Sequence, residues 1–192
     1  MSNHEELYGI AEGQGGYFSA AQARAVGISR DLLSYHARIG RFERVAQGVY
    51  RLRQFPGSPH EDLFTAQLRA GPESVVSHDS ALALYELSDV LPAEVHLTVP
   101  KTASRRRPGI RQHTRRINPD EVTAREGLRV TTVPRTLADV ARSGISEDRL
   151  RQATQEAVDR GMVGNRELEA AAIRYGGRAG RIFRRYLRQE SP

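Results

Sequence analysis

The sequence contains no cysteine, and Lys101 is the only lysine among its 29 basic residues. Without thiols the chain cannot form disulfides, use a thiolate nucleophile, or hold zinc or iron–sulfur clusters through cysteine. It also has no run of 18 apolar residues, so we expect no membrane-spanning helix. Polar residues follow Met1 directly. This start predicts no signal peptide and a cytoplasmic protein.

The single lysine also bears on enzyme chemistry. A restriction-type nuclease site needs a strand with a carboxylate, one spacer residue and a lysine, but Val99 stands two residues before Lys101. The chain has no Gly-Lys-Ser/Thr phosphate loop and no Gly-x-Ser-x-Gly elbow. We therefore predict that the protein is not an enzyme and needs no cofactor. A nucleic-acid-modifying enzyme in the second half is the alternative, and it would need clustered carboxylates.

The length and composition indicate a folded protein. The chain has 192 residues, of which 39% are hydrophobic and 27% charged. This balance permits a packed core, and the length suits one domain or a small domain plus a medium one.

The basic residues are unevenly placed along the chain. Arginine codons in GC-rich DNA can explain the Arg/Lys ratio, so the positions of the charges are more informative. Residues 101–116 hold seven basic residues and no acid, and residues 174–188 hold six arginines and no acid. Between residues 61 and 100 the net charge is −6. Each basic stretch suits contact with a polyanion, although a solvated surface is an equally simple interpretation.

The N-terminal third predicts a helix-turn-helix. After a short helix over residues 4–12, a capping box formed by Ser19 and Gln22 begins a second helix. Gly27 ends this helix, and Ser29 caps a third, which runs to about residue 39. Two short helices joined by a turn that contains glycine are typical of the helix-turn-helix arrangement.

The third helix is amphipathic. We expect Leu32, His36 and Ile39 on its apolar side, with Leu33 and Tyr35 flanking them. Arg30, Asp31, Ser34 and Arg38 are then left for the solvent side.

A β-hairpin is expected next, with strands at 42–45 and 49–52 joined at Gly48. A hairpin directly after a helix-turn-helix is a wing, so the first 56 residues predict a winged-helix DNA-binding domain. The same module can instead be used for protein–protein contact.

The remaining sequence predicts a separate domain. Pro56–Pro59 reads as a linker, which gives domains at 1–56 and 61–192. The second domain should be mixed α/β with a helical C-terminal tail. Its expected strands are 74–77, 95–99, 110–114 and 128–132, and its expected helices are 61–69, 79–87, 134–141, 146–161, 165–175 and 178–188.

The DNA-contacting residues follow from this arrangement. In a winged helix the second helix of the turn enters the major groove. There Arg30 can read guanine bidentately and Asp31 can accept from a cytosine amine, while arginines on or beside the wing meet phosphates. The candidate DNA-binding residues are Ser29, Arg30, Asp31, Ser34, Arg38, Arg41, Arg44, Arg51, Arg53, Arg105, Arg106, Arg107 and Arg111.

Other candidate sites have weaker patterns. No His-Glu-x-x-His and no helical histidine pair occurs, so we expect no metal site and structural roles for His60, His78, His96 and His113. The triplet 77–79 reads Ser-His-Asp, but adjacent helical residues point in different directions. Arg135 and Asp139 stand at i, i+4 and are expected to pair as a structural feature of a helix start.

The sequence resembles a known family in two regions. Gly16-Tyr17-Phe18-Ser19-Ala20-Ala21-Gln22-Ala23, followed by 27–29, 40–45 and 48–51, is similar to the N-terminal domain of AbiEi-type antitoxins. Ser77-His78-Asp79-Ser80-Ala81-Leu82, followed by 95–100 and 134–139, is similar to the C-terminal domain of the same family. Each segment is short, and their order and spacing together carry the resemblance, which covers about residues 14–142.

The resemblance implies an antitoxin of a type IV toxin–antitoxin system for abortive infection, a phage defence. Such a protein represses its own promoter by binding inverted repeats in double-stranded DNA through its winged helix. Its second domain counters a nucleotidyltransferase-like toxin. Two alternatives stay open: a stand-alone regulator without a toxin, and an antitoxin that acts only through protein contacts.

Overall fold

The computed structural model describes residues 2–89, 91–103 and 106–189. Its contacts divide the chain into two compact units. The first unit contains Met1–Ser74 and Ala124–Arg129, and the second contains Val75–Thr123 and Val130–Pro192. The expected mixed α/β class is confirmed. The first unit thus extends beyond the expected boundary at Pro56–Pro59.

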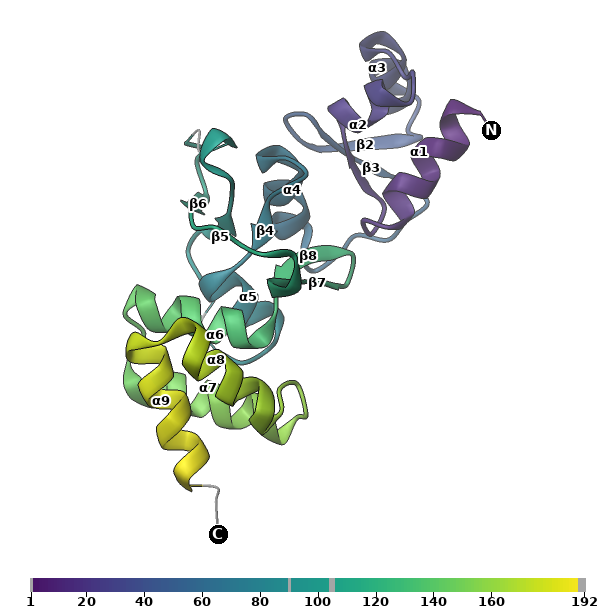
Figure 1. Cartoon of the computed structure of the whole chain (residues 1–192). Coiled ribbons are helices and arrows are strands. Elements are labelled where there is room, and N and C mark those ends of the chain that lie inside the picture. Colours follow the sequence, from purple (N-terminus) through teal and green to yellow (C-terminus); the bar gives the residue numbers. More distant parts are fainter. Residues whose placement is uncertain (1, 90, 104–105, 190–192) are drawn as a thin grey trace. The chain divides into compact units, whose positions relative to one another are not determined.

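The first unit begins with three helices and a small sheet (Figure 1). The strands lie in the order β1-β3-β2, and both pairings are antiparallel. In chain order the elements are α1 (Asn3–Glu12), β1 (Tyr17–Ser19), α2 (Ala20–Ala25), α3 (Arg30–Arg38), β2 (Phe42–Ala46) and β3 (Val49–Leu52). The expected hairpin is therefore present after the two short helices.

Local capping explains where α2 and α3 start. The Ser19 hydroxyl accepts the backbone N–H of Gln22 at 3.1 Å, and the Gln22 side chain accepts the N–H of Ser19 at 2.8 Å. The Ser29 hydroxyl accepts the N–H of Leu32 at 3.2 Å. Between the helices Gly27 has a φ of 83°, which glycine adopts at little cost. The turn between the two helices is thus determined by the capping serines and by Gly27.

A small apolar core holds these elements together. Phe18 and Ile28 are fully buried, and Leu7, Leu33 and Phe42 are nearly so. The rings of Phe18 and Phe42 meet edge to face, with centroids 5.1 Å apart. The core therefore joins α1 and α3 to the sheet.

Helix α4 (Glu61–Ala70) also belongs to the first unit. The rings of Phe64 and Tyr17 stack with centroids 4.8 Å apart, and the Tyr17 hydroxyl donates to Glu61 at 3.0 Å. The side chain of His60 pairs with Glu126 at 3.1 Å. Because the contacts of Phe64 and Glu61 fasten α4 to β1, the first unit continues past the proline-containing segment.

The second unit is built around a five-stranded sheet with the strand order β6-β5-β4-β8-β7, although the ends of β7 and β8 that lie within residues 124–129 belong to the first unit. Strand β4 pairs antiparallel with β5 and parallel with β8, and β5 pairs parallel with β6. The strands are β4 (Val75–Val76), β5 (Val95–Thr98), β6 (Ile110–His113), β7 (Val122–Arg125) and β8 (Leu128–Thr131). Four of them match expected strands, and β7 was not expected.

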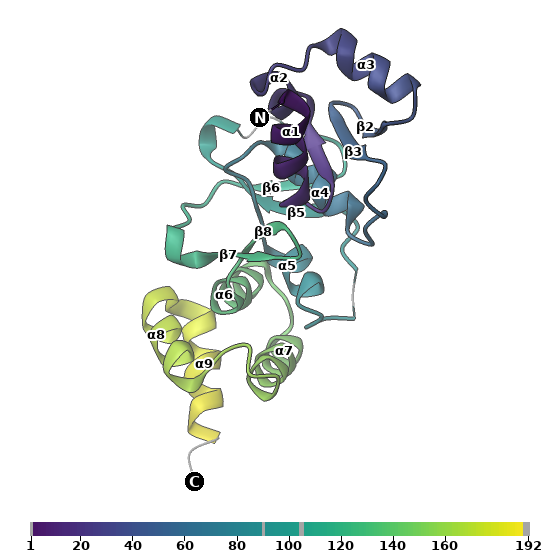
Figure 2. The same ribbon diagram turned by 90° about the vertical axis from the view of Figure 1, so that its right-hand side faces the viewer.

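In the described residues five α-helices complete the second unit, and α6 is the central one. Its residues from Arg135 to Ala141 are all buried, and it packs against α5, α7, α8 and α9 (Figure 2). The helices are α5 (His78–Leu84), α6 (Val133–Ser143), α7 (Glu147–Asp159), α8 (Asn165–Tyr175) and α9 (Gly177–Gln189). Among the helices of the described residues, none is long and apolar enough to cross a membrane.

A buried ion network lies at the start of α6. Arg135 pairs with Asp139 at 2.8 Å, which confirms the expected i, i+4 contact, and with Glu121 at 2.9 Å. Tyr175 donates to Glu121 at 2.8 Å. Burial alone would raise the pKa of Glu121, but hydrogen bonds from the Asn118 N–H and Tyr175, with the Arg135 charge, hold it below its usual value. The network joins α6 to the segment before β7.

Candidate nucleic-acid interface

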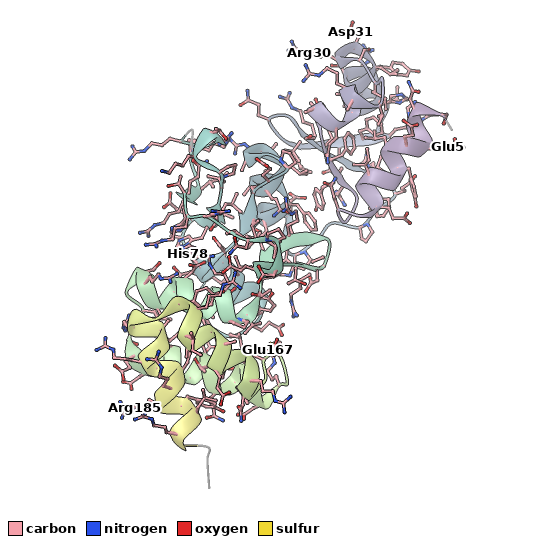
Figure 3. The ribbon with its side chains drawn as sticks, viewed as in Figure 1. Glu5, Arg30, Asp31, His78, Glu167 and Arg185 are labelled. Atoms are coloured by element: carbon pink, nitrogen blue, oxygen red, sulfur yellow. The ribbon has the colours of Figure 1, made fainter. Side chains whose placement is uncertain are left out.

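Helix α3 presents a polar face to solvent. Arg30, Asp31, Ser34 and Arg38 are exposed, whereas Leu33 and His36 are buried. Figure 3 shows Arg30 and Asp31 at the outer side of α3. The Ser34 hydroxyl donates to the Arg30 carbonyl oxygen at 3.0 Å, so it is already used within the helix. The two arginines and Asp31 are thus the charged groups of this face.

Two large apolar side chains share the exposed side of α3. Tyr35 is 46% exposed and Ile39 is 45% exposed, so the expectation that Ile39 lies on the buried side is wrong. Each step of three residues along an α-helix rotates the side chain back by about 60°. The side chains of Leu33 and His36 point toward the core, but two such steps after Leu33 the side chain of Ile39 points toward solvent. A helical wheel centred on Leu33 would have predicted the exposure of Ile39. On the same exposed side, the Arg38 guanidinium lies 5.9 Å from the centroid of the Tyr35 ring.

His36 fixes the inner side of α3. Its ring meets His4 edge to face, with centroids 4.7 Å apart, and lies 5.0 Å from the ring of Phe42. Within the described residues neither ring nitrogen has a hydrogen-bond partner. Burial, with the nearby charges of His4 and Arg41, lowers the pKa of His36. A neutral imidazole thus packs α3 against α1 and β2.

The arginines of the hairpin have different environments. Arg44 is exposed on β2, whereas Arg51 pairs with Glu43 and donates to the Phe55 carbonyl oxygen at 2.8 Å. Arg41 and Arg53 are exposed at the base of the hairpin, where they help to line a cavity of about 440 Å³. The turn at Gln47–Gly48 carries no arginine. Arg51 is therefore held within the protein.

The arginines of the second unit also fall into two groups. Arg106, Arg107 and Arg111 line one cavity beside β6, and Arg105 lies outside the described residues. Several arginines of the 174–188 stretch make internal contacts instead. Within the described residues these are Arg174 with Asp120 at 2.6 Å, Arg178 with the Ala141 carbonyl at 2.9 Å, Arg184 with the Ala172 carbonyl at 3.2 Å, and Arg185 with Glu147 at 3.1 Å. This stretch is therefore largely part of the helical packing.

A histidine cluster fills the interior beside β5 and β6. The rings of His78 and His113 stack with centroids 3.5 Å apart, and His96 lies 5.2 Å from His113. Burial, with the nearby His113, His96 and arginines, lowers the pKa of His78 to about 2. Burial, with the nearby His96, Arg111 and Arg115, lowers the pKa of His113 to about 4. All three rings are thus neutral near pH 7.

The Ser-His-Asp triplet does not form a triad. The Ser77 hydroxyl lies 2.9 Å from Nδ1 of His78, but Asp79 faces His96 instead, at 3.4 Å. Ser77 is fully buried and also accepts a hydrogen bond from Thr98 at 2.9 Å. Ser77, His78 and Thr98 thus form a buried polar network, whereas Asp79 is partly exposed. Within the part of the chain that the structure describes, no group of three His, Asp or Glu side chains is placed to hold a metal ion.

Comparison with protein families places the first unit. Residues 5–53, which contain α1 to β3, match a family of transcriptional regulators. The matching family model is the AbiEi antitoxin, so the resemblance seen in the sequence is confirmed for this segment. The match does not extend to the second unit, where the resemblance stays a prediction. A search of curated proteins finds no match to the chain.

Proposed function

We propose that this protein is a sequence-specific DNA-binding transcriptional regulator whose first unit is a winged helix. The match to transcriptional regulators over residues 5–53 is the observation that carries this proposal. The chain order α1-β1-α2-α3-β2-β3 and the sheet order β1-β3-β2 support it, because they put a hairpin beside a helix-turn-helix. Such a regulator acts on DNA in the cytoplasm.

In this proposal α3 reads the major groove. Arg30 and Arg38 are exposed and suited to the O6 and N7 acceptors of guanine, and Asp31 suits the amine of cytosine. Tyr35 and Ile39 add apolar surface next to these charges, which suits the methyl group of thymine. Ser29 caps the helix at its N-terminal end, and Ser34 lies in the middle of the exposed face.

Phosphate contacts are assigned to exposed arginines around this helix. Arg44 on the hairpin and Arg41 and Arg53 at its base meet this requirement. Arg51 is left out, because Glu43 already neutralises it. Phosphate contacts position a protein on DNA without reading the sequence, so these residues supply affinity and salt dependence.

A band-shift titration against the DNA upstream of the protein's own gene tests the proposal. The wild type should bind this DNA more tightly than unrelated DNA. Arg38→Ala should narrow that preference by about 5- to 150-fold, the range for losing one bidentate base contact. The matched control is Arg149→Ala, an exposed arginine of α7, which should retain the preference. Binding that is absent, or indifferent to sequence in the wild type, would refute the proposal.

We further propose that the regulator is an antitoxin that represses its own promoter at inverted repeats and counters a nucleotidyltransferase-like toxin. The family match supports this, since its model is that of an antitoxin. The neighbouring gene should encode such a toxin, and co-expression should restore the growth that the toxin alone arrests. If the protein binds its promoter but no neighbouring product is toxic, it is a stand-alone regulator. Rescue by a variant that has lost DNA binding would show that neutralisation acts through protein contacts.

A further inference from the structure

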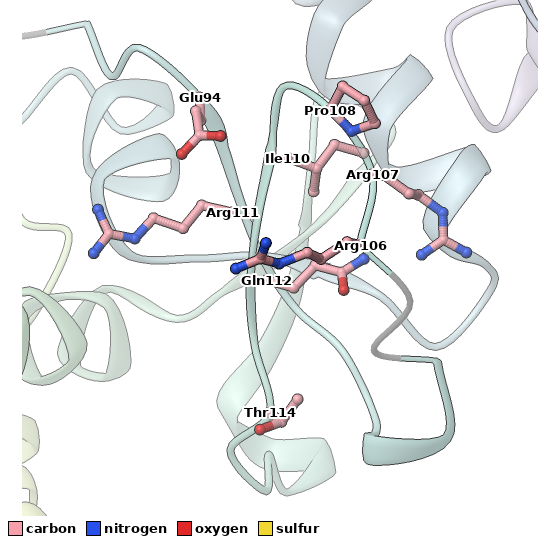
Figure 4. A pocket seen from close by; sticks show the side chains of 8 residues that line it. All are labelled: Glu94, Arg106, Arg107, Pro108, Ile110, Arg111, Gln112 and Thr114. Atoms are coloured by element: carbon pink, nitrogen blue, oxygen red, sulfur yellow. The ribbon is translucent and has the colours of Figure 1, made fainter.

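A cavity of about 600 Å³ lies within the second unit, beside strand β6 (Figure 4). Its charged lining consists of Arg106, Arg107 and Arg111 with one carboxylate, Glu94. Gln112 and Thr114 add polar groups to the wall. The volume is in the range of pockets that hold small ligands. The lining carries an excess of positive charge.

The local fold brings these arginines together. Arg107 and Ile110 form an isolated bridge, and the Ile110 N–H donates to the Arg107 carbonyl oxygen at 3.2 Å. The turn between them contains Pro108 and Gly109, and Gly109 has a φ of 75°. Proline followed by a glycine with positive φ suits the two central positions of a tight turn. This turn folds the chain back, so that Arg106 and Arg107 line the same cavity as Arg111 on β6.

The position of β6 leaves the cavity accessible. Strand β6 is at the end of the strand order, with β5 as its neighbour. Arg106 and Arg111 are both exposed. Within the described residues, neither has a side-chain ion-pair partner. In this they differ from Arg135, Arg174 and Arg178 of the same unit, which are all bonded internally.

An unsatisfied donor lies in the same wall. The side-chain Nε2 of Gln112 is buried and has no hydrogen-bond partner within the described residues. A buried donor without an acceptor costs free energy, and the side chain that carries it forms part of the cavity wall. This observation is independent of the arginine charges.

The donors define the chemical class of the ligand. Guanidinium groups, an amide N–H₂ and a hydroxyl all suit phosphate oxygens, and the arginine fork suits them best. Glu94 is the one strong acceptor of the wall, and it suits a sugar hydroxyl or a base amine. We propose that this pocket binds the phosphate of a nucleotide, either free or within a nucleic-acid backbone. This goes beyond the reading of DNA by α3 and does not depend on it.

Calorimetric titration of the full-length protein tests the pocket, with ATP and inorganic pyrophosphate as probes for free phosphates. Random-sequence duplex DNA, titrated at several salt concentrations, probes backbone phosphates. The test variant is Arg106→Gln with Arg111→Gln. The matched control is Arg149→Gln with Arg166→Gln, which removes the same charge from exposed positions on α7 and α8. Melting curves check that both variants are folded.

Two results support the proposal and identify the source of the phosphate. If ATP or pyrophosphate binds, the test variant should weaken that binding at least tenfold while the control retains it. If only duplex DNA binds, the test variant should lower the slope of log affinity against log salt by about two, at about 0.9 per phosphate. The control should leave that slope almost unchanged.

Equal effects of the test and control variants on every probe would overturn the proposal, and so would the absence of binding to all of them. The outcome is separable from that of the proposed regulator function. Loss of sequence preference in Arg38→Ala reports on α3 alone, whereas the variants at Arg106 and Arg111 report on the pocket.

Discussion

Acid should destabilise the second unit through its histidine cluster. His78 is 2% exposed and stacks on His113, and His96 is 5% exposed with its ring 5.2 Å from that of His113. A proton on any one ring would be placed among the other two rings, with Arg111, Arg115 and Arg135 nearby and Asp79 as the facing carboxylate. The folded protein therefore keeps the rings neutral at pH values where the unfolded chain protonates them.

The sign and size follow from the pKa values. A histidine titrates near 6.5 in an unfolded chain. In the folded protein the pKa is about 2 for His78 and about 4 for His113. Since the unfolded state binds the extra protons, stability is complete above pH 6.5 and is lost as the pH falls below it. Each such ring costs about 1.4 kcal/mol per pH unit, so two of them remove about 3 kcal/mol between pH 6.5 and 5. That is a large share of a typical total stability of about 5–15 kcal/mol.

Urea unfolding at pH 7.5, 6.5, 5.5 and 5.0, followed by circular dichroism, measures this loss. The test variant is His78→Asn, because asparagine carries no titrating ring and tolerates the φ of 51° at this position. It should reduce the dependence of stability on pH by about one proton. An identical pH dependence in His78→Asn and the wild type would refute the reasoning, whatever the absolute stability of the variant.

Three further predictions concern packing and charge. Arg135→Met should destabilise the protein by about 3–5 kcal/mol in urea unfolding, because two buried carboxylates lose their cation; a loss below about 1 kcal/mol would contradict the network. Gly180→Ala should lower the melting temperature, since its Cβ would lie 2.5 Å from a carbonyl oxygen of α8, whereas Gly9→Ala, with nothing within 4 Å, should raise it slightly. Arg44→Ala should lower the slope of log DNA affinity against log salt by about one, whereas Arg51→Ala should leave that slope unchanged. Equal slopes for the two variants would show that pairing with Glu43 does not keep Arg51 from contacting phosphate.

Much of the local structure was predictable, because it is determined by residues close together in the sequence. The capping residues Ser19 and Ser29 fix the starts of α2 and α3, and Gly27 permits the turn between them. The pair Arg135 and Asp139 lies one helical turn apart, so its contact needed only the helix. The exposed polar face of α3 followed in the same way.

The features that were missed depend on distant parts of the chain. Helix α4 joins the first unit because Phe64 stacks on Tyr17, and no pattern of neighbouring residues in the sequence predicts that contact. The sequence predicted a basic surface at Arg174 and Arg178, but Arg174 pairs with Asp120 and Arg178 donates to the Ala141 carbonyl oxygen near the end of α6. A charge count along the sequence cannot distinguish a free guanidinium from a bonded one. The bonding partners of each arginine can be assigned only once the three-dimensional fold is known.

The six residues Ala124–Arg129 belong to the first unit although they are inserted within the sequence of the second. The chain thus passes from one unit to the other three times, after Ser74, Thr123 and Arg129. Residues 1–74 expressed alone would lack this segment, and with it Glu126, the partner of His60. The first unit is therefore discontinuous in sequence, and a truncation that ends at Ser74 would leave it incomplete.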